Sequence, residues 1–304
     1  GIVMLILTFI FSPLKKLKNG KTIFLVVAIS GVWFYSMLTG LSPSVLRAAV
    51  MFSFVILGSE LQRDSSVYQS LLVSALILVL IDPHIIFKIG FLLSYLAVFG
   101  IVFFHPKIFA LFHFKNFILR KTWQITSVSI AAQIATFPIG IYCFQQFPNF
   151  FLLANLIVIP LSFVILVVGL AYLIAYSIPF LSDILLFILD WCIWGLNAGV
   201  KWVEDLPYSV FWGISIQWYD VLFLYGFIFS LTFALIRKRK KLLIISFFLL
   251  TFSVGLNLIE KFQFQDQNQI VIYSIKNEIA MDVFYGQQIT FFGTETLLKD
   301  ENKL

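Results

Sequence analysis

Charged residues are scarce in this sequence. Only 12% of its 304 residues are Asp, Glu, Lys or Arg, whereas 61% are hydrophobic and 36 are Phe. A soluble domain has about 25% charged residues. The composition therefore excludes an ordinary soluble globular domain and predicts a protein that resides in a lipid bilayer. We attribute the net charge of +6 to the loops that orient a membrane protein rather than to an anionic partner.

Cysteine and histidine are also rare. Cys143 and Cys192 both lie in apolar stretches, so the sequence offers no disulfide framework. The three histidines are His84, His105 and His113. None has a second metal-ligating residue at a suitable spacing, apart from Asp82 near His84. Because glycine-rich phosphate loops and hydrolase motifs are also missing, we predict no metal, no cofactor and no enzymatic activity.

Long apolar runs dominate the sequence instead. A helix that crosses a bilayer needs about 20 mostly apolar residues, so we predict an all-α polytopic membrane protein, a bundle of about ten transmembrane helices with a short β-like C-terminal tail. The predicted spans are residues 1–12 (partial), 22–38, 43–58, 68–81, 85–104, 123–144, 151–176, 184–203, 217–236 and 242–258. Asp82-Pro83 separates two spans so briefly that a tight hairpin is expected. Because the first span looks cut in half, we expect an N-terminally truncated chain.

The basic residues fall in alternate loops, which orients the predicted spans. They are Lys15, Lys16, Lys18 and Lys21, then Arg63, then Lys107, Lys115, Arg120 and Lys121, and finally the run 237–241. The intervening loops at Thr39, Asp82 and Gln145 carry no Lys or Arg. Lys and Arg concentrate in cytoplasmic loops, so the C-terminal tail is predicted to face outward. Residues 182–205 suit an interfacial amphipathic helix almost as well as a span.

The sequence changes character after Leu258. The stretch "QDQNQIVIYSIKNEIAMDVFYGQQITFFG" is polar, rich in β-branched and aromatic residues, and broken at Lys276 and Gly286. It predicts two or three antiparallel strands. We therefore divide the chain into a transmembrane domain of residues 1–258 and an extracytoplasmic, β-rich tail of residues 259–304. A tail this short is not expected to fold alone, so we expect it to be incomplete, either as the start of a truncated soluble domain or as a flap on the membrane core.

Arg47 stands out because it lies within an apolar stretch, "LSPSVLRAAVMFSFVILG". Ser42 is a plausible N-cap and Pro43 a favoured first helical residue, so Arg47 falls about one turn inside the helix. One interpretation is that its long side chain snorkels to the interface. The other is that it faces a polar cavity, as ionisable groups in membrane helices commonly do. Physical reasoning alone leaves both interpretations open.

Three blocks of sequence together resemble a known family. They are "SPSVLRAAVM", "DPHIIFKIGFLLSYLAVFGI" and "AAQIATFPIGIYCFQQFPNFFLLANLIVIPLSF". In this order and spacing they resemble the competence domain of ComEC-type proteins across residues 1–258. The resemblance implies an inner-membrane channel that translocates single-stranded DNA into the cytoplasm during natural transformation. It also implies membrane lipid, other competence proteins and a cytoplasmic DNA-translocating ATPase as partners, and a homo-oligomer as one form of assembly.

Carried over to individual residues, the resemblance places a DNA path along three helices. Arg47 and Ser44 lie on the first, Gln133 and Thr136 on the second, and Asn155 on the third. A guanidinium suits phosphate, while hydroxyl and amide groups satisfy sugars and base edges without demanding a sequence. For Gln133 and Asn155, hydrogen bonding between helices is the alternative role.

The sequence also departs from the family pattern. Leu92 stands where a polar residue is often found, and the family's Ser-Gly-Leu-His motif would lie before Gly1. Within these 304 residues we expect neither the His and Asp cluster of a β-lactamase-like domain nor an oligonucleotide-binding-like domain. The resemblance therefore does not extend to DNA binding outside the membrane or to degradation of one strand.

Two further classes of protein fit the residues. A secondary transporter for a small anion would also carry an intramembrane arginine and broken helices, and its activity would not depend on DNA. A membrane scaffold that only anchors the tail would tolerate replacement of Arg47 by Leu.

Overall fold

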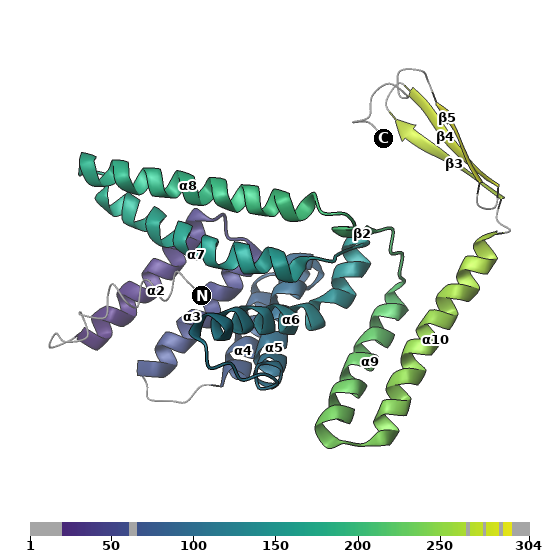
Figure 1. The fold of residues 1–304 in the computed structure, drawn as a ribbon, viewed down its shortest axis with the longest axis horizontal. Helices are drawn as coiled ribbons and strands as arrows, with labels where there is room; N and C mark the ends of the chain where they lie inside the picture. Colours follow the sequence, from purple (N-terminus) through teal and green to yellow (C-terminus); the bar gives the residue numbers. More distant parts are fainter. Residues whose placement is uncertain (1–19, 61–65, 266–267, 276–277, 286–287, 294–304) are drawn as a thin grey trace. The chain divides into compact units, whose positions relative to one another are not determined.

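A computed structural model describes residues 20–60, 66–265, 268–275, 278–285 and 288–293. Long apolar helices make up most of these residues (Figure 1). The helices are α2 (Gly20–Leu38), α3 (Pro43–Glu60), α4 (Val67–Ile81), α5 (Ile89–Phe109), α6 (Phe117–Phe144), α7 (Phe151–Ala175), α8 (Pro179–Glu204), α9 (Trp218–Arg237) and α10 (Lys240–Gln265), with a short 3-10 helix, η2 (Pro83–Phe87). Each α-helix corresponds to a predicted span.

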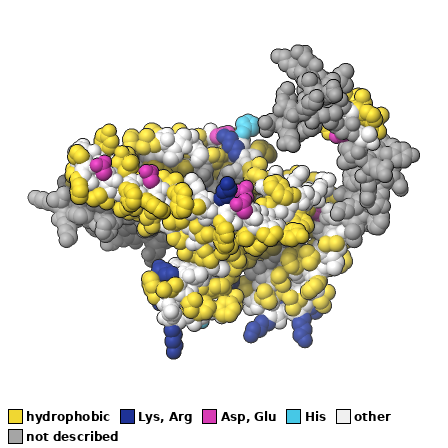
Figure 2. Space-filling view, turned by 45° about the horizontal axis from the view of Figure 1, so that its top comes forward, with side chains coloured by type: hydrophobic (Ala, Val, Ile, Leu, Met, Phe, Trp, Pro, Cys, Tyr) yellow, Lys and Arg dark blue, Asp and Glu magenta, His cyan; other side chains and the backbone are white. Residues whose placement is uncertain are grey.

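Six of these helices, α5 to α10, are long and apolar enough to cross a membrane, whereas α2, α3 and α4 offer shorter apolar stretches. The first predicted span lies outside the described residues, so the count of ten is not confirmed. By length and composition, α8 qualifies as a span, which favours that interpretation of residues 182–205. Hydrophobic side chains cover much of the visible described surface, and Lys and Arg gather at a few points (Figure 2).

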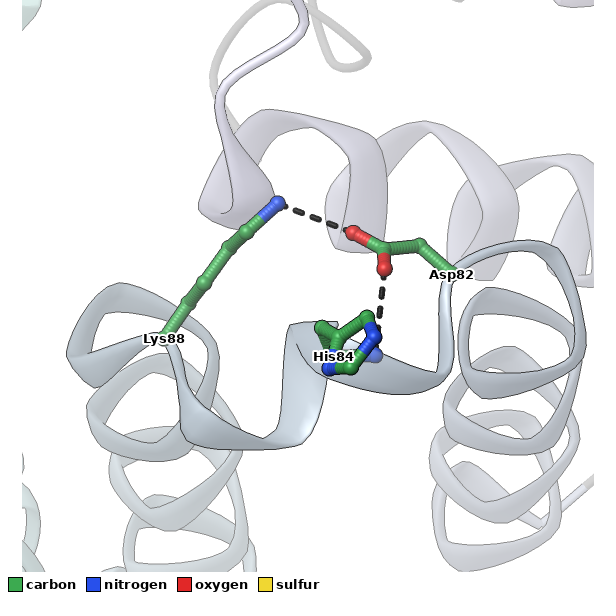
Figure 3. A network of polar contacts seen from close by, with 3 residues as sticks. All are labelled: Asp82, His84 and Lys88. Atoms are coloured by element: carbon green, nitrogen blue, oxygen red, sulfur yellow. Dashed lines mark hydrogen bonds and ion pairs between the residues drawn. The ribbon is translucent and has the colours of Figure 1, made fainter.

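The predicted hairpin between α4 and α5 is built around Asp82 (Figure 3). Its carboxylate accepts a hydrogen bond from the His84 backbone N–H (3.1 Å) and pairs with the Lys88 ammonium (2.9 Å). Pro83 begins η2 and ends α4. The hydrogen bond from Lys88 lowers the pKa of the Asp82 carboxyl below its ordinary value.

The sequence-based boundary of the α5 span is wrong in one respect. The predicted span starts at Ile85, which places Lys88 inside the membrane helix, but α5 begins at Ile89 and Lys88 is its N-cap. The predicted loop was too short because η2 is apolar and therefore resembles the start of a span. This loop carries a basic residue after all, although Asp82 neutralises it.

The chain divides into two compact units, Gly1–Ser215 and Ile216–Leu304. The second unit contains the hairpin of α9 and α10 together with the strands of the tail. The division into a transmembrane domain and a tail at Leu258 stays a prediction. The helix α10 also continues to Gln265, beyond the predicted span.

In the first unit, α5 and α6 pack closely. A Cβ atom added to Gly100 would lie 2.5 Å from Ala135 Cβ and 2.6 Å from the Ala131 carbonyl oxygen. Close backbone approach through small residues is the usual packing mode of helices in lipid, where apolar surface alone provides no driving force between helices. The pair α7 and α8 also lies side by side (Figure 1).

A small antiparallel sheet joins two distant loops of the first unit. Strand β1 (Gln146–Pro148) pairs with β2 (Val210–Trp212), and Phe147 lies opposite Phe211. The Asn149 side-chain amide donates to the Tyr208 carbonyl (2.7 Å). These contacts fix the loop after α6 to the segment that follows α8.

In the second unit, a buried carboxylate joins the two helices. Asp220, in the first turn of α9, is 1% exposed and accepts hydrogen bonds from Ser253 Oγ (2.7 Å) and Asn257 Nδ2 (2.8 Å) of α10. It also accepts from the backbone N–H of Gln217, the N-cap of α9 (2.9 Å). A buried charge is tolerated only when it is hydrogen-bonded in this way.

The described residues of the tail form three antiparallel strands, which agrees with the prediction of two or three. They are β3 (Asn268–Ile275), β4 (Glu278–Tyr285) and β5 (Gln288–Gly293), in the order β3-β4-β5. In the register, Ile270 lies opposite Val283, and Val283 opposite Thr290.

Candidate functional site

Arg47 lies in the second turn of α3, as the sequence predicts from the Pro43 start. Its side chain is half-buried, and its guanidinium carbon lies 5.8 Å from the centre of the Tyr95 ring on α5. The Tyr95 hydroxyl lies 2.9 Å from Ser74 Oγ on α4. Three helices thus meet around one polar group within the first unit.

The guanidinium has unused hydrogen-bonding capacity. Its Nε is buried and has no hydrogen-bond partner, and no carboxylate among the described residues pairs with Arg47. An arginine that only snorkelled would hold its head in water. The half-buried position beside Tyr95 therefore favours an inward-facing role over snorkelling, and a free donor in this place suits an anionic group.

A separate cavity of about 520 Å³ lies between the start of α5, the end of α6 and β1. Gln133 and Thr136 of α6 both line it, as do Ser94 of α5 and Gln146 of β1. The remaining lining is mostly apolar and small, with Gly90, Ala97 and Gly140 widening the space. The cavity is therefore an apolar hollow with a few polar groups, which is the usual character of a binding site.

The polar groups of this cavity differ in how many of their hydrogen-bonding atoms have partners within the protein. Thr136 Oγ1 donates to the Ala132 carbonyl and Ser94 Oγ to the Phe91 carbonyl, both at 2.9 Å. Their lone pairs remain available to a ligand. The Gln146 Oε1 is buried without a partner, and no hydrogen bond joins the Gln133 amide to another described residue. Amide groups without partners can serve a ligand that presents both donors and acceptors.

The structure does not bring all five predicted residues together. Gln133 and Thr136 share the cavity, but Arg47, Ser44 and Asn155 are not among its described lining residues. Ser44 is exposed on the first turn of α3, and Asn155 is half-buried on α7. No described residue bonds the Gln133 or Asn155 amide, so the alternative of hydrogen bonding between helices has no support among the described residues.

Two residues of these sites, Gln146 and Tyr95, are not predicted from the sequence. Gln146 belongs to the polar loop "QQFPN", and only its pairing in β1 places it at the cavity. Tyr95 resembles any aromatic residue of an apolar span, and its contact with Arg47 depends on helix packing. Within the described residues, no group of three or more His, Cys, Asp or Glu side chains could hold a metal ion.

Long apolar helices, six of them long enough to cross a membrane, together with a half-buried arginine and a cavity with isolated polar groups, are typical of a helical membrane protein. The chain belongs to the competence protein family, which it matches over residues 1–239. The match includes Arg47 and the whole cavity, which confirms the resemblance found in the sequence. It ends at the turn between α9 and α10, before the predicted limit at Leu258.

The chain is also similar to ComE operon protein 3 of Bacillus subtilis (strain 168), with 32% identity over 126 residues. The alignment covers 41% of this chain and 15% of that relative. The chain therefore corresponds to a small part of the relative's length. No solved structure matches the chain.

Proposed function

We propose that this chain forms part of a channel in the cytoplasmic membrane through which single-stranded DNA enters the cytoplasm during natural transformation. The observation that carries the proposal is the cavity lined by Gln133, Thr136 and Gln146, because it lies within the part of the chain that matches the competence family. Arg47 adds a cation that has no carboxylate partner among the described residues. Competence proteins that act in the membrane need a route for a polyanion through an apolar layer.

The chemistry of these residues suits a substrate of any sequence. Amides and hydroxyls contact sugars and base edges without selecting one base, and a guanidinium attracts phosphate through charge. In this proposal the chain itself cleaves no phosphodiester bond. The force for movement comes from a partner, such as a cytoplasmic DNA-translocating ATPase, and other competence proteins deliver the strand.

Filling the cavity tests this function. We expect Thr136→Leu to lower the entry of labelled DNA into a nuclease-protected state by about tenfold, the change that about 1.4 kcal/mol at the passage barrier produces. DNA bound outside the cell should be unchanged. Thr251→Leu is the control, because Thr251 also donates to its own helix (2.9 Å to Phe247) but is exposed and lines no described cavity.

The result separates the candidate functions. Equal DNA entry in the Thr136 and Thr251 variants would remove the cavity from the path. A transporter of a small anion, which the unpaired Arg47 also fits, predicts normal DNA entry together with loss of substrate-coupled anion uptake. A scaffold predicts no change in either measurement.

The proposal includes an orientation in which the basic loops face the cytoplasm and the tail faces outward. Single cysteines at Gly40, Asn149 and Ile272 should react with a membrane-impermeant thiol reagent in intact cells. Cysteines at Asn116 and Lys240 should react only after the membrane is permeabilised. This pattern follows from the distribution of Lys and Arg over alternate loops.

Both native cysteines must first be replaced by alanine, since they would add background labelling. Labelling of Lys240→Cys but not of Ile272→Cys in intact cells would show the opposite orientation, with the tail in the cytoplasm. Labelling of all five positions would indicate a leaky membrane. A cytoplasmic marker protein that stays unlabelled in the same cells shows that the membrane was intact.

A further inference from the structure

The helices α9 and α10 form a hairpin (Figure 1). A groove of about 960 Å³ runs along this hairpin near the turn that joins the two helices. Its walls are apolar and come from both helices. They are formed by Gly226, Phe229, Phe233, Leu242, Ile245 and Leu249. Four cations line its end at the turn, namely Arg237, Arg239, Lys240 and Lys241. The groove therefore combines an apolar trough with a strongly positive end.

The cations of the turn have no acidic partner among the residues that the structure describes. No Asp or Glu lines the groove, and within the described part of the chain none of the four cations forms an ion pair. Arg237 only lies over the Phe233 ring, 5.8 Å from its centre. The acidic residue of α9, Asp220, lies in the first turn, about 25 Å away along the helix at 1.5 Å per residue. The positive charge of the turn is therefore not neutralised by an acidic side chain that lines the groove.

Helix stability does not explain these residues. Lys240 and Lys241 lie in the first turn of α10, where the helix dipole disfavours cations. Lys238 ends α9 with φ of 49°, a left-handed conformation that glycine adopts at lower cost. The orientation rule accounts for cations at a cytoplasmic turn, but it does not require a groove between the helices beside them.

The groove below the cations offers little to a polar solute. Its hydroxyl, Ser230 Oγ, donates to the Leu242 carbonyl (2.8 Å), so its hydrogen is already used. The order of groups, with charge at the membrane surface and apolar wall toward the bilayer centre, matches a phospholipid. We propose that this groove binds one anionic phospholipid, with its phosphate on the cations of the turn and an acyl chain along the apolar wall.

This inference does not rest on DNA transport, and the test is direct. The full chain in neutral detergent is titrated with phosphatidylglycerol or phosphatidylcholine and followed by native mass spectrometry. We expect one phosphatidylglycerol per chain, bound at least tenfold more tightly than phosphatidylcholine. The double variant Arg239→Gln, Lys240→Gln should lose this preference. The control Lys115→Gln, Lys121→Gln removes the same charge from exposed positions near the start of α6 and should keep it.

A second pair of variants tests the apolar wall with all cations in place. Gly226→Phe should fill the groove, because its Cβ would already lie 3.2 Å from Leu249 Cδ1. Ile245→Trp fills it from a position that is 48% exposed, so this variant should fold normally. Both should weaken phosphatidylglycerol binding at least tenfold.

Four results would overturn the proposal. Equal binding of the two lipids would show that the cations select no headgroup. Equal loss in the Lys115 and Lys121 control would show that only total charge matters. Unchanged binding in the Ile245→Trp variant would show that the lipid does not occupy the groove. A dimer of the wild type without lipid would show that another occupant, such as a second copy of the chain, fills it.

Discussion

Replacement of Arg47 by Leu is expected to lower transformation at least 100-fold while the protein level in the membrane and the DNA bound outside stay unchanged. The guanidinium is half-buried, and within the described part of the chain its Nε has no hydrogen-bond partner. Loss of one partner from a desolvated charge pair costs roughly 2–5 kcal/mol. A phosphate that has lost this contact therefore faces a much higher barrier. No carboxylate among the described residues needs the charge, so folding should not suffer.

Replacement of Arg47 by Lys should retain part of the function. Lysine keeps a point charge but not the planar fork that engages phosphate in a bidentate way. Lysine also stacks less well on the Tyr95 ring. A snorkelling arginine predicts a different pattern, in which Lys is fully tolerated and Leu is nearly silent.

The matched control is Arg120→Leu. Arg120 also lies over an aromatic ring, 6.0 Å from the centre of Phe117, but it is exposed at the start of α6. We expect normal transformation from this variant. If Arg47→Leu transforms as well as Arg120→Leu at equal protein level, Arg47 has no part in the mechanism. A pairing of Arg47 with Asp190 is not supported, since Asp190 is exposed and no ion pair joins them among the described residues.

The second large effect is expected at Gly100, where α5 and α6 approach closely. Gly100→Ala should lower the free energy of unfolding by about 1–3 kcal/mol, the usual cost of overpacking, and Gly100→Val by more. The added Cβ would lie 2.5 Å from Ala135 Cβ and 2.6 Å from the Ala131 oxygen, so the helices must separate. Thermal unfolding in detergent, followed by tryptophan fluorescence, measures the change.

Two further variants identify the cause of this loss. Gly90→Ala is the control on the same helix, because no atom lies within 4 Å of its added Cβ. It should be neutral or slightly stabilising, since alanine has the higher helix propensity. Ala135→Gly should restore part of the stability of Gly100→Ala but not all, because the Ala131 carbonyl remains in place. Equal stability of the Gly100→Ala and Gly90→Ala variants would disprove the close packing.

Because α5 and α6 also form the cavity, the same substitutions connect stability to function. A separation of the helices should move Ser94 of α5 away from Gln133 and Thr136 of α6, so that a DNA strand no longer contacts these polar groups together. DNA entry should then fall in Gly100→Ala cells even at a growth temperature where the protein persists. Gly90 also lines the cavity, so Gly90→Ala could itself change DNA entry. This variant is therefore a control for the stability measurement and not for DNA entry.

The helices of this protein were largely predictable from the sequence. Apolar runs of sufficient length indicate spans, and the Ser42-Pro43 and Asp82-Pro83 pairs mark where helices begin and end, because capping and proline geometry act over a few residues. The strands of the tail followed from β-branched and aromatic residues broken by turn residues. The sequence-based prediction assigned the apolar η2 to the following span, because composition alone does not distinguish a short apolar 3-10 helix from the start of a membrane helix.

Only the tertiary structure decided which faces of the helices meet. Lipid is as apolar as a protein interior, so the polarity pattern of a membrane helix does not identify its packing face. The approach of Gly100 to Ala131 and Ala135, the contact of Arg47 with Tyr95, and the bonds of Asp220 to residues 33 and 37 positions later all depend on that choice. The cavity has the same origin, because the pairing of β1 with a strand far along the chain places Gln146 beside Gln133 and Thr136.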